Sequence, residues 1–328
     1  MNKTLFEHLY KRYTDKVEQW IWRSVRTRTP RSVYQPIRYI LSSGGKHVRP
    51  VLVLLSCEAV GGRSDRALPA AGAIEILHNF TLVHDDVMDH ARLRRGRPTI
   101  HTKWDTNVAI LAGDQMAACA YRMLLKTGTE NIRRVSEVFT DAFNEVCEGQ
   151  GLDKEFESRD NVGLPDYLRM IAKKTGRVIA AATEIGGLIG HGSRLQVTAL
   201  RKFGEYLGLA FQVKDDLLDV TGDVRELGKT IGGDIVEGKK TFLLLHAWKR
   251  AKGKERQLLR RVIRRRVLTR PKVDEVRTLY ETLGVLREAE RTIERCTRRA
   301  QRELDRLPAH RSREMLRWLS EQLLLRSM

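Results

Sequence analysis

Apolar residues recur at intervals of three and four along almost the whole chain of 328 residues. The spacing is clearest in the stretches that begin at Arg66, Asn107 and Gln196, and it is typical of helices with one buried face. No alternating run of apolar and polar residues is long enough to predict a sheet. The sequence therefore predicts an all-α bundle of roughly a dozen helices around one core. No Ser/Gly-rich linker divides the chain, so we expect a single domain over residues 1–328.

Positive charge is concentrated in the last quarter of the chain. The formal net charge is +19, and residues 249–328 hold 24 Lys and Arg against 11 Asp and Glu. Such an excess occurs in proteins that bind nucleic acid or anionic membranes, and also on solvated helix faces. No aromatic residue interleaves with the arginines of residues 260–270, which weakens the case for nucleic acid. We expect no nucleic-acid partner, and at most weak membrane-surface contact through the basic C-terminal helices.

The distribution of apolar residues and cysteines bears on the compartment. The sequence has no apolar run of the roughly 18 residues that a membrane-spanning helix needs. Its four cysteines lie far apart and form neither a C-x-x-C pair nor a zinc-binding pattern. We expect buried thiols in a reducing environment, and hence a cytoplasmic protein.

An Asp-Asp-x-x-Asp pattern occurs twice, each time at the end of an apolar helical run. The residues are Asp85, Asp86 and Asp89 in the first copy, and Asp215, Asp216 and Asp219 in the second. The first and third carboxylates of each copy are four residues apart, so they share a helix face and repel unless a cation lies between them. Mg²⁺ prefers oxygen ligands and is commonly held by a few carboxylates and substrate phosphates. The two copies therefore predict a magnesium-binding site.

Basic residues accompany the aspartates in short polar segments. They are Lys46, Arg49, Arg94, Arg95, Lys174, Lys229 and Lys239. Arginine binds phosphate oxygens through its planar fork and lysine binds them as a point charge. Together these residues predict a polyphosphate substrate bridged by magnesium, with a second, metal-free anion site nearby. Paired carboxylates alone would favour a glycosidase, but that chemistry has no use for the cations.

The segment "GKT" within residues 221–241 invites comparison with a phosphate-binding P-loop. Five residues separate Gly222 from Gly228, whereas the Walker A motif requires four and a preceding strand. The P-loop interpretation therefore fails. A Gly-rich loop after a long helix is instead expected to act as a lid.

The ordered motifs resemble those of a known family. The segments "GGKHVRP", "LHNFTLVHDDVMDHARLRRGRPT", "GQGLD", "KKTG", "FQVKDDLLD" and "GKTIGGDIVEGKKT" are similar to the motifs of the trans-isoprenyl diphosphate synthases, also called polyprenyl synthetases. The resemblance covers about residues 40–245, while residues 249–328 match only as generic helices. It implies the isoprenoid synthase fold, with helices around a central active-site cavity, and a homodimer.

The resemblance also implies a role for each matching residue. The two aspartate motifs would bind three Mg²⁺ ions together with the allylic diphosphate. Arg94, Lys174, Lys229 and Lys239 would hold that diphosphate, and Thr175 and Gln212 would face the reacting carbons. Lys46, Arg49, His78 and Arg95 would form the metal-free pocket for isopentenyl diphosphate. His47 stands where the family usually has arginine, so we expect this pocket to persist with an altered charge at its rim.

The implied reaction is a magnesium-dependent prenyl transfer. Isopentenyl diphosphate would be condensed head-to-tail, in trans, with dimethylallyl, geranyl or farnesyl diphosphate. Product length would be set on the helix before Asp85 by Phe80 as a floor, by the small Thr81 beside it and by Leu77. This combination resembles the geranylgeranyl type, which makes a 20-carbon product. A farnesyl or a longer polyprenyl diphosphate synthase is the alternative.

Three more distant interpretations stay open on the sequence. A terpene cyclase shares the first aspartate motif but usually lacks a second "DDLLD". A non-catalytic partner subunit would be expected to have lost one of the motifs. A basic nucleic-acid-binding helical protein is supported only by the C-terminal charge.

Overall fold

The structure is a computed structural model that describes residues 3–25, 29–222, 232–264 and 270–325. Helices dominate it, as the periodicity predicts. In the first half they are α1 (Lys3–Ser24), α2 (Arg31–Leu41), α3 (Val48–Ala59), α4 (Ser64–Met88), α5 (Ile100–Lys103), α6 (Thr106–Leu124) and α7 (Ile132–Ser158). They continue with α8 (Leu164–Ile171), a π-helical turn η1 (Ala172–Gly176), α9 (Arg177–Ile189), α10 (Arg194–Thr221), α12 (Gly233–Glu237) and α13 (Phe242–Arg250). The last are α14 (Gly253–Ile263), α15 (Arg270–Thr282), α16 (Val285–Leu304) and α17 (Arg311–Leu325).

Side-chain caps define where several of these helices begin. Asp105 accepts a hydrogen bond from the Val108 amide at the start of α6. Ser193 and Gln196 form a reciprocal capping box at the start of α10. Such caps satisfy amides that have no partner inside the helix and contribute about 1 kcal/mol each.

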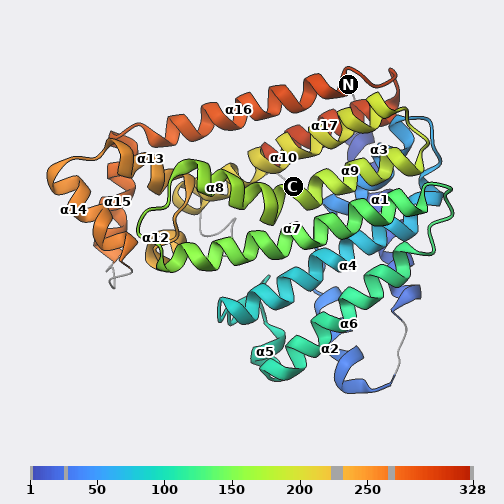
Figure 1. Ribbon diagram of the computed structural model, residues 1–328, viewed down its shortest axis with the longest axis horizontal. Helices are drawn as coiled ribbons and strands as arrows, with labels where there is room; N and C mark the ends of the chain where they lie inside the picture. The colour runs from blue at the N-terminus through green and yellow to red at the C-terminus, as the bar shows by residue number, and fades with distance from the viewer. Residues whose placement is uncertain (1–2, 26–28, 223–231, 265–269, 326–328) are drawn as a thin grey trace.

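The helices form a layered bundle (Figure 1). Helix α4 packs against α3 and α6, α9 packs against α3, α7 and α10, and α16 runs along α10. One buried cluster fills the space between α1, α3, α4, α6, α7 and α9, and a second lies under α13–α16. The N-terminal half of α10 contributes to the first cluster and its C-terminal half to the second. This long helix therefore ties the two clusters together.

A two-residue strand pair interrupts the helical pattern directly after the first aspartate motif. Strands β1 (Leu93–Arg94) and β2 (Arg97–Pro98) pair antiparallel. Both turn residues have a positive φ, 52° at Arg95 and 72° at Gly96, which is the conformation of a type I′ hairpin turn. The hairpin is too short to appear as an alternating pattern in the sequence. It turns Arg95 back toward the segment before α3.

The sequence predicts buried, unpaired cysteines and no membrane-spanning helix. All four cysteines are free, and Cys57, Cys119 and Cys296 are buried as expected. Cys147 of α7 is exposed, so the expectation of a buried thiol was wrong at that position, where the thiol lies within electrostatic reach of Asp85. Across the described ranges, no helix combines the length and the apolar character needed to cross a membrane.

Candidate active site

The first aspartate motif lies at the C-terminal end of α4. Asp85 is partly buried, and burial together with neighbouring Asp89 raises its pKa to about 6, although Lys174 opposes the shift. Asp89 is the residue that follows the helix, and Lys154 of α7 lies 3.4 Å from its carboxylate. Asp86 differs from both, because it is only 2% exposed. Its carboxylate accepts two hydrogen bonds from the Arg94 guanidinium, at 2.8 and 2.6 Å.

The second motif lies at the C-terminal end of α10, and its middle residue is again the most enclosed. Asp216 is 4% exposed. It accepts hydrogen bonds from the Tyr167 hydroxyl at 2.6 Å, the Phe242 amide at 2.9 Å and the Gln212 side-chain amide at 3.1 Å. Burial nevertheless raises its pKa to about 6. Asp219 accepts a hydrogen bond from the Asp234 amide at 3.1 Å.

The two motifs therefore share an arrangement that the sequence does not reveal. In each, the middle aspartate turns inward to protein donors, whereas the first and third are less buried. An i, i+4 pair lies on one helix face and the residue between lies on another. Asp86 thus anchors Arg94, and Asp216 anchors the start of α13, while the outer aspartates are better placed to meet a ligand.

Lys174 and Thr175 lie in the π-helical turn η1. Such turns insert an extra residue and often occur at functional sites. The Lys174 ammonium lies 2.6 Å from the Asp153 carboxylate of α7, and the Thr175 hydroxyl donates to the Gln212 side chain at 2.9 Å. A Cβ atom at Gly149 would lie only 2.4 Å from the Lys174 amide nitrogen. Glycine at that position therefore lets α7 approach the turn closely enough for these contacts.

Lys239 connects the second motif with the first. Its ammonium lies 3.7 Å from Asp234 and 2.7 Å from Glu237. These carboxylates, Asp234 foremost, and also Asp89 raise its pKa above the usual lysine value, although burial opposes them. Burial and the neighbouring carboxylates of the second motif, Asp219 first, raise the pKa of Asp234 to about 8. Lys239 thus lies within the electrostatic reach of both motifs.

A separate group of cations gathers at the start of α3. The Arg49 guanidinium donates to the His78 ring nitrogen Nε2 at 3.2 Å, and its buried Nε has no hydrogen-bond partner in the described part of the chain. Burial and the nearby Arg49 and Arg95 lower the pKa of His78 to about 3, so its ring is neutral. Arg95 lies against Gly45, where an added Cβ would be 3.1 Å from its guanidinium. The group brings together three of the four residues predicted for the metal-free pocket.

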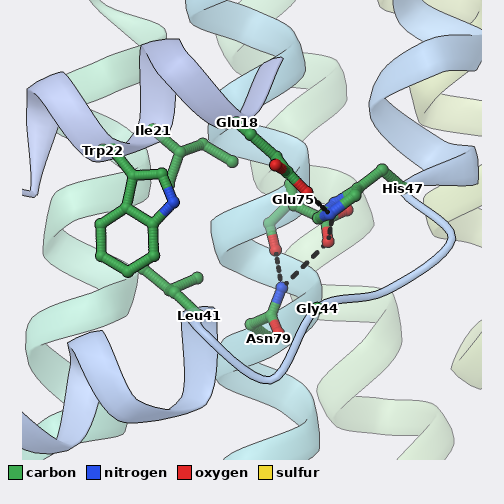
Figure 2. A pocket seen from close by; sticks show the side chains of 8 residues that line it. All are labelled: Glu18, Ile21, Trp22, Leu41, Gly44, His47, Glu75 and Asn79. Atoms are coloured by element: carbon green, nitrogen blue, oxygen red, sulfur yellow. Dashed lines mark hydrogen bonds and ion pairs between the residues drawn. The ribbon is translucent and has the colours of Figure 1, made fainter. Parts of the chain in front are cut away.

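Lys46, the fourth predicted residue, belongs to the turn before α3, and α1 covers this turn. The Tyr10 hydroxyl of α1 donates to the Lys46 carbonyl oxygen. Next to it, His47 has a left-handed backbone with φ of 46°. Its ring lies between two carboxylates, 2.9 Å from Glu18 of α1 and 3.0 Å from Glu75 of α4, as Figure 2 shows.

These carboxylates govern the charge of His47. Burial lowers the pKa of His47, but Glu75 and Glu18 outweigh burial and raise it. Glu75 also accepts a hydrogen bond from Asn79 at 3.2 Å, and its ion pair with His47 holds its pKa at about 2 despite burial. His47 is thus tied to the protein on both sides, and the altered charge that the sequence predicts at the rim of the pocket is shared with Glu18 and Glu75.

The residues predicted to set product length lie on α4 before Asp85. Leu77 is fully buried, Phe80 is 7% exposed and Thr81 is half-buried. The Phe80 ring packs edge-on against Phe143 of α7, with centroids 5.1 Å apart. Tyr121 of α6 lies behind Phe143 at 6.3 Å. Phe80 is therefore the first ring of an aromatic wall that two other helices complete.

Several contributing residues were not predicted from the sequence. Asp153 lies within "GQGLD" and Asp234 within "GKTIGGDIVEGKKT", so both motifs were recognised but these carboxylates were not singled out. Lys154 and Tyr167 have no local signal, because their roles depend on partners far away in the sequence. Lys229, predicted to hold the allylic diphosphate, lies outside the described residues, as do residues 223–231 of the loop predicted to form a lid.

The site suits a hard divalent cation by its donor chemistry. The raised pKa values of Asp85 and Asp234 arise from burial and from neighbouring carboxylates, and a bound cation would relieve that repulsion. Among the described residues, no group of three or more His, Cys, Asp or Glu side chains is gathered closely enough to hold a metal by itself. This agrees with the behaviour of Mg²⁺, which is usually shared between one or two carboxylates and substrate phosphates.

Comparisons with known proteins are consistent with this geometry. The family model for polyprenyl synthetase matches residues 30–283, beyond the segment in which the sequence motifs lie. A geranylgeranyl diphosphate synthase of Methanosarcina mazei is 43% identical over 223 residues, which are 67% of this chain and 69% of that protein.

Solved structures extend the similarity over nearly the whole chain. The geranylgeranyl pyrophosphate synthetase of Pyrococcus horikoshii is 36% identical, with a TM-score of 0.91 over 97% of this chain and 98% of that one. A polyprenyl synthase of Caulobacter crescentus, crystallised with calcium and isoprenyl diphosphate, is 30% identical, with a TM-score of 0.89 over 97% and 96%. The chain described here belongs to the polyprenyl synthetase family and has the isoprenoid synthase fold.

Proposed function

We propose that the protein is a magnesium-dependent prenyltransferase that condenses isopentenyl diphosphate with an allylic diphosphate, head-to-tail and in trans. The observation that carries the proposal is the pairing of two aspartate motifs with Lys174 and Lys239 at one place, and a separate group of cations around Arg49 at another. A reaction between two diphosphate esters needs these two kinds of anion site. The names of its relatives support the same activity.

The allylic diphosphate would be held by Lys174, Lys239 and Arg94, whose positive charges stabilise the negative charge that develops as the allylic carbon–oxygen bond breaks. Bound Mg²⁺, for which we propose Asp85, Asp89, Asp215 and Asp219 as the ligands, supplies further electrostatic stabilisation of that diphosphate. A relative crystallised with calcium and isoprenyl diphosphate supports a divalent ion. Three ions remain the number that the family resemblance implies.

The carbon chemistry would take place beside Thr175 and Gln212. Their mutual hydrogen bond continues to Asp216, and this holds both side chains in one orientation. The double bond of isopentenyl diphosphate, held by Lys46, Arg49 and Arg95, attacks the allylic carbon, and the released diphosphate is the base that accepts the lost proton. Neutral His78 would act through Arg49, because its Nε2 already accepts from that guanidinium. Exclusion of water protects the reactive carbon.

For the product we propose geranylgeranyl diphosphate. Phe80 and the rings behind it would close the apolar channel, and the synthases of Methanosarcina mazei and Pyrococcus horikoshii carry that name. Farnesyl diphosphate or a longer product is the alternative.

We also propose a homodimer of one-domain subunits in the cytoplasm. The continuous helix α10, which belongs to both buried clusters, supports a single domain. Exposed Ile110 and Leu111 on α6 offer an apolar surface to a second subunit, and the free cysteines suit a reducing compartment. Light scattering of the purified protein tests the dimer.

The decisive experiment is incubation with isopentenyl diphosphate, Mg²⁺ and each allylic primer, followed by chain-length analysis. We expect elongation with Mg²⁺ and none with EDTA. The matched variants are Asp85→Asn, expected to lose activity, and Asp274→Asn at an exposed position of α15, expected to retain it. Absence of metal-dependent elongation by the folded wild-type protein would refute the proposed function.

A further inference from the structure

A cavity of about 550 Å³ lies at the end of the bundle opposite the predicted isopentenyl diphosphate pocket. It is enclosed by the first half of α1, the turn between α3 and α4, and the first turn of α17. Helix α3 separates the two sites, because it begins beside His47 and ends beside the cavity; its 12 residues span about 18 Å. The volume falls within the range of roughly 300–1,000 Å³ that is usual for small-molecule sites.

The lining of the cavity is rich in arginine. Arg12, Arg63 and Arg311 all border it. In the described part of the chain, no hydrogen bond or ion pair engages the guanidinium of any of them. Lys16, which also borders the cavity, is paired with Asp65 at 2.9 Å. The lining thus holds four cationic side chains against the carboxylates of Asp65 and Glu58, and positive charge is in excess around this space.

Glu58, one of the two carboxylates in the lining, holds the surrounding helices together. Glu58 of α3 accepts a hydrogen bond from the Tyr13 hydroxyl at 2.6 Å and another from the Ser312 hydroxyl at 2.8 Å. Arg12 and Arg311 oppose the rise in the pKa of Tyr13 that burial and Glu58 cause, which places both guanidinium groups near this hydroxyl. Glu58 thus fixes α1, α3 and α17 around the cavity, and both arginines lie near the hydroxyl that it accepts from.

Two long helices also begin at this cavity. Ser64 starts α4 and Arg311 starts α17. The residue before α4 provides no side-chain cap, whereas at the start of α17 the Ser312 amide donates to the His310 ring at 3.3 Å. The first amides of a helix lack partners within it and carry partial positive charge, which favours a bound anion. Leu9 and Met315 add an apolar part to the lining.

We infer that this cavity binds a ligand bearing a diphosphate group, at a site distinct from the proposed catalytic centre. The guanidinium groups of Arg12 and Arg311 contact the anion by their planar forks, Arg63 adds a third charge, and the uncapped first amides of α4 complete the site. The diphosphate group can come from free diphosphate or from the headgroup of a prenyl ester whose chain lies along Leu9 and Met315. The inference does not depend on the proposed catalytic activity.

Calorimetric titration with inorganic diphosphate in EDTA tests the site without contributions from metal binding. The wild-type protein should show binding that the Arg12→Ala/Arg311→Ala variant weakens at least about tenfold, a change of about 1.4 kcal/mol. The Lys46→Ala/Arg95→Ala variant removes cations from the predicted isopentenyl diphosphate pocket and should retain this binding. If only the second variant loses binding, the diphosphate occupies the catalytic pocket and the inference is wrong.

The matched control removes two arginines that do not line the cavity. Arg291 and Arg302 are exposed on α16, and Arg291→Ala/Arg302→Ala should bind diphosphate like the wild type. An equal loss in the control would mean general electrostatic attraction and would overturn the inference. If the alanine variant does not fold, Arg12→Lys/Arg311→Lys replaces it, because lysine retains the positive charge but lacks the planar guanidinium. This variant should bind diphosphate at least about threefold more weakly than the wild type. Unchanged binding would contradict the inferred diphosphate site.

A second arm identifies the source of the diphosphate group. Farnesyl diphosphate in EDTA, titrated into the Lys46→Ala/Arg95→Ala variant, should bind more tightly than inorganic diphosphate if the prenyl chain contacts Leu9 and Met315. Equal affinities would assign the site to free diphosphate. Binding of neither probe by this folded variant would refute the inference.

Discussion

The ammonium of Lys174 lies 2.6 Å from the carboxylate of Asp153. The two residues come from different elements, because Asp153 is on α7 and Lys174 is in the π-helical turn after α8. Asp153 is partly buried and pairs with no other cation among the described residues. The contact therefore orients the lysine that we expect to meet the allylic diphosphate.

Replacement of this carboxylate should impair catalysis through Lys174. We expect Asp153→Asn to lower kcat/KM for the allylic substrate by about 10- to 100-fold, because a misplaced catalytic group can cost that much. If Asp153 acts only as a positioning residue, Asp153→Asn/Lys174→Ala should be no slower than Lys174→Ala. Steady-state kinetics of the three variants measures this. Additive losses would show that Asp153 has an independent role.

The neighbouring ion pair provides the control. Lys173 pairs with exposed Glu148 on the outer side of the same turn. Like Asp153→Asn, Glu148→Gln removes one carboxylate of α7 that pairs with a lysine of this turn. We expect its kcat/KM to stay within about twofold of the wild type, since exposed ion pairs contribute little.

Because Asp216 points inward, we expect its replacement to lower stability, whereas replacement of the neighbouring Asp215 should lower activity alone. Asp216→Asn places an amide NH₂ among three donors, so we expect a loss of about 1–3 kcal/mol in the free energy of unfolding. Asp215→Asn, one residue away and less buried, should abolish activity while changing stability by no more than about 0.5 kcal/mol. Urea unfolding in EDTA measures both. Equal destabilisation of the two variants would contradict the distinction between inner and outer aspartates.

The features that could be predicted from the sequence are those that arise from residues close together in the chain. Helical periodicity and the two aspartate motifs are local patterns, and they led to the all-α fold and to the cations that the structure gathers near them. The inward turn of Asp86 and Asp216 depends on Arg94 and Tyr167, which lie in other elements. Such contacts between distant segments leave no spacing in the sequence by which they could be recognised.

The same reason explains the environment of His47. The sequence marks it as a departure from an arginine-bearing motif and suggests an altered rim. Its partners Glu18 and Glu75 come from helices before and after it, and neither belongs to a motif. The packing of α1 and α4 around the turn brings them to the ring (Figure 2).

His47 should make stability depend on pH. Its pKa is raised in the folded protein, so its contribution is complete below the unfolded value of about 6.5 and is lost as pH rises through the folded value. Glu75, with a pKa of about 2, stays ionised throughout. The wild type should therefore lose melting temperature relative to His47→Gln as the pH rises above about 6.5. His191→Gln, at an exposed position, is the control, and a parallel pH profile for His47→Gln and the wild type would disprove the coupling.

The aromatic wall behind Phe80 predicts a graded change in product length. Phe80→Ala should lengthen the product, but Phe143 and Tyr121 remain behind it, so the extension should stop at the next ring. Phe80→Ala/Phe143→Ala should then give still longer chains. Fully buried Phe203 of α10 provides the control: Phe203→Leu should lower stability by about 1 kcal/mol and leave the product unchanged. Chromatography of the dephosphorylated products decides the matter, because an unchanged distribution in both Phe80 variants would remove the wall from chain-length control.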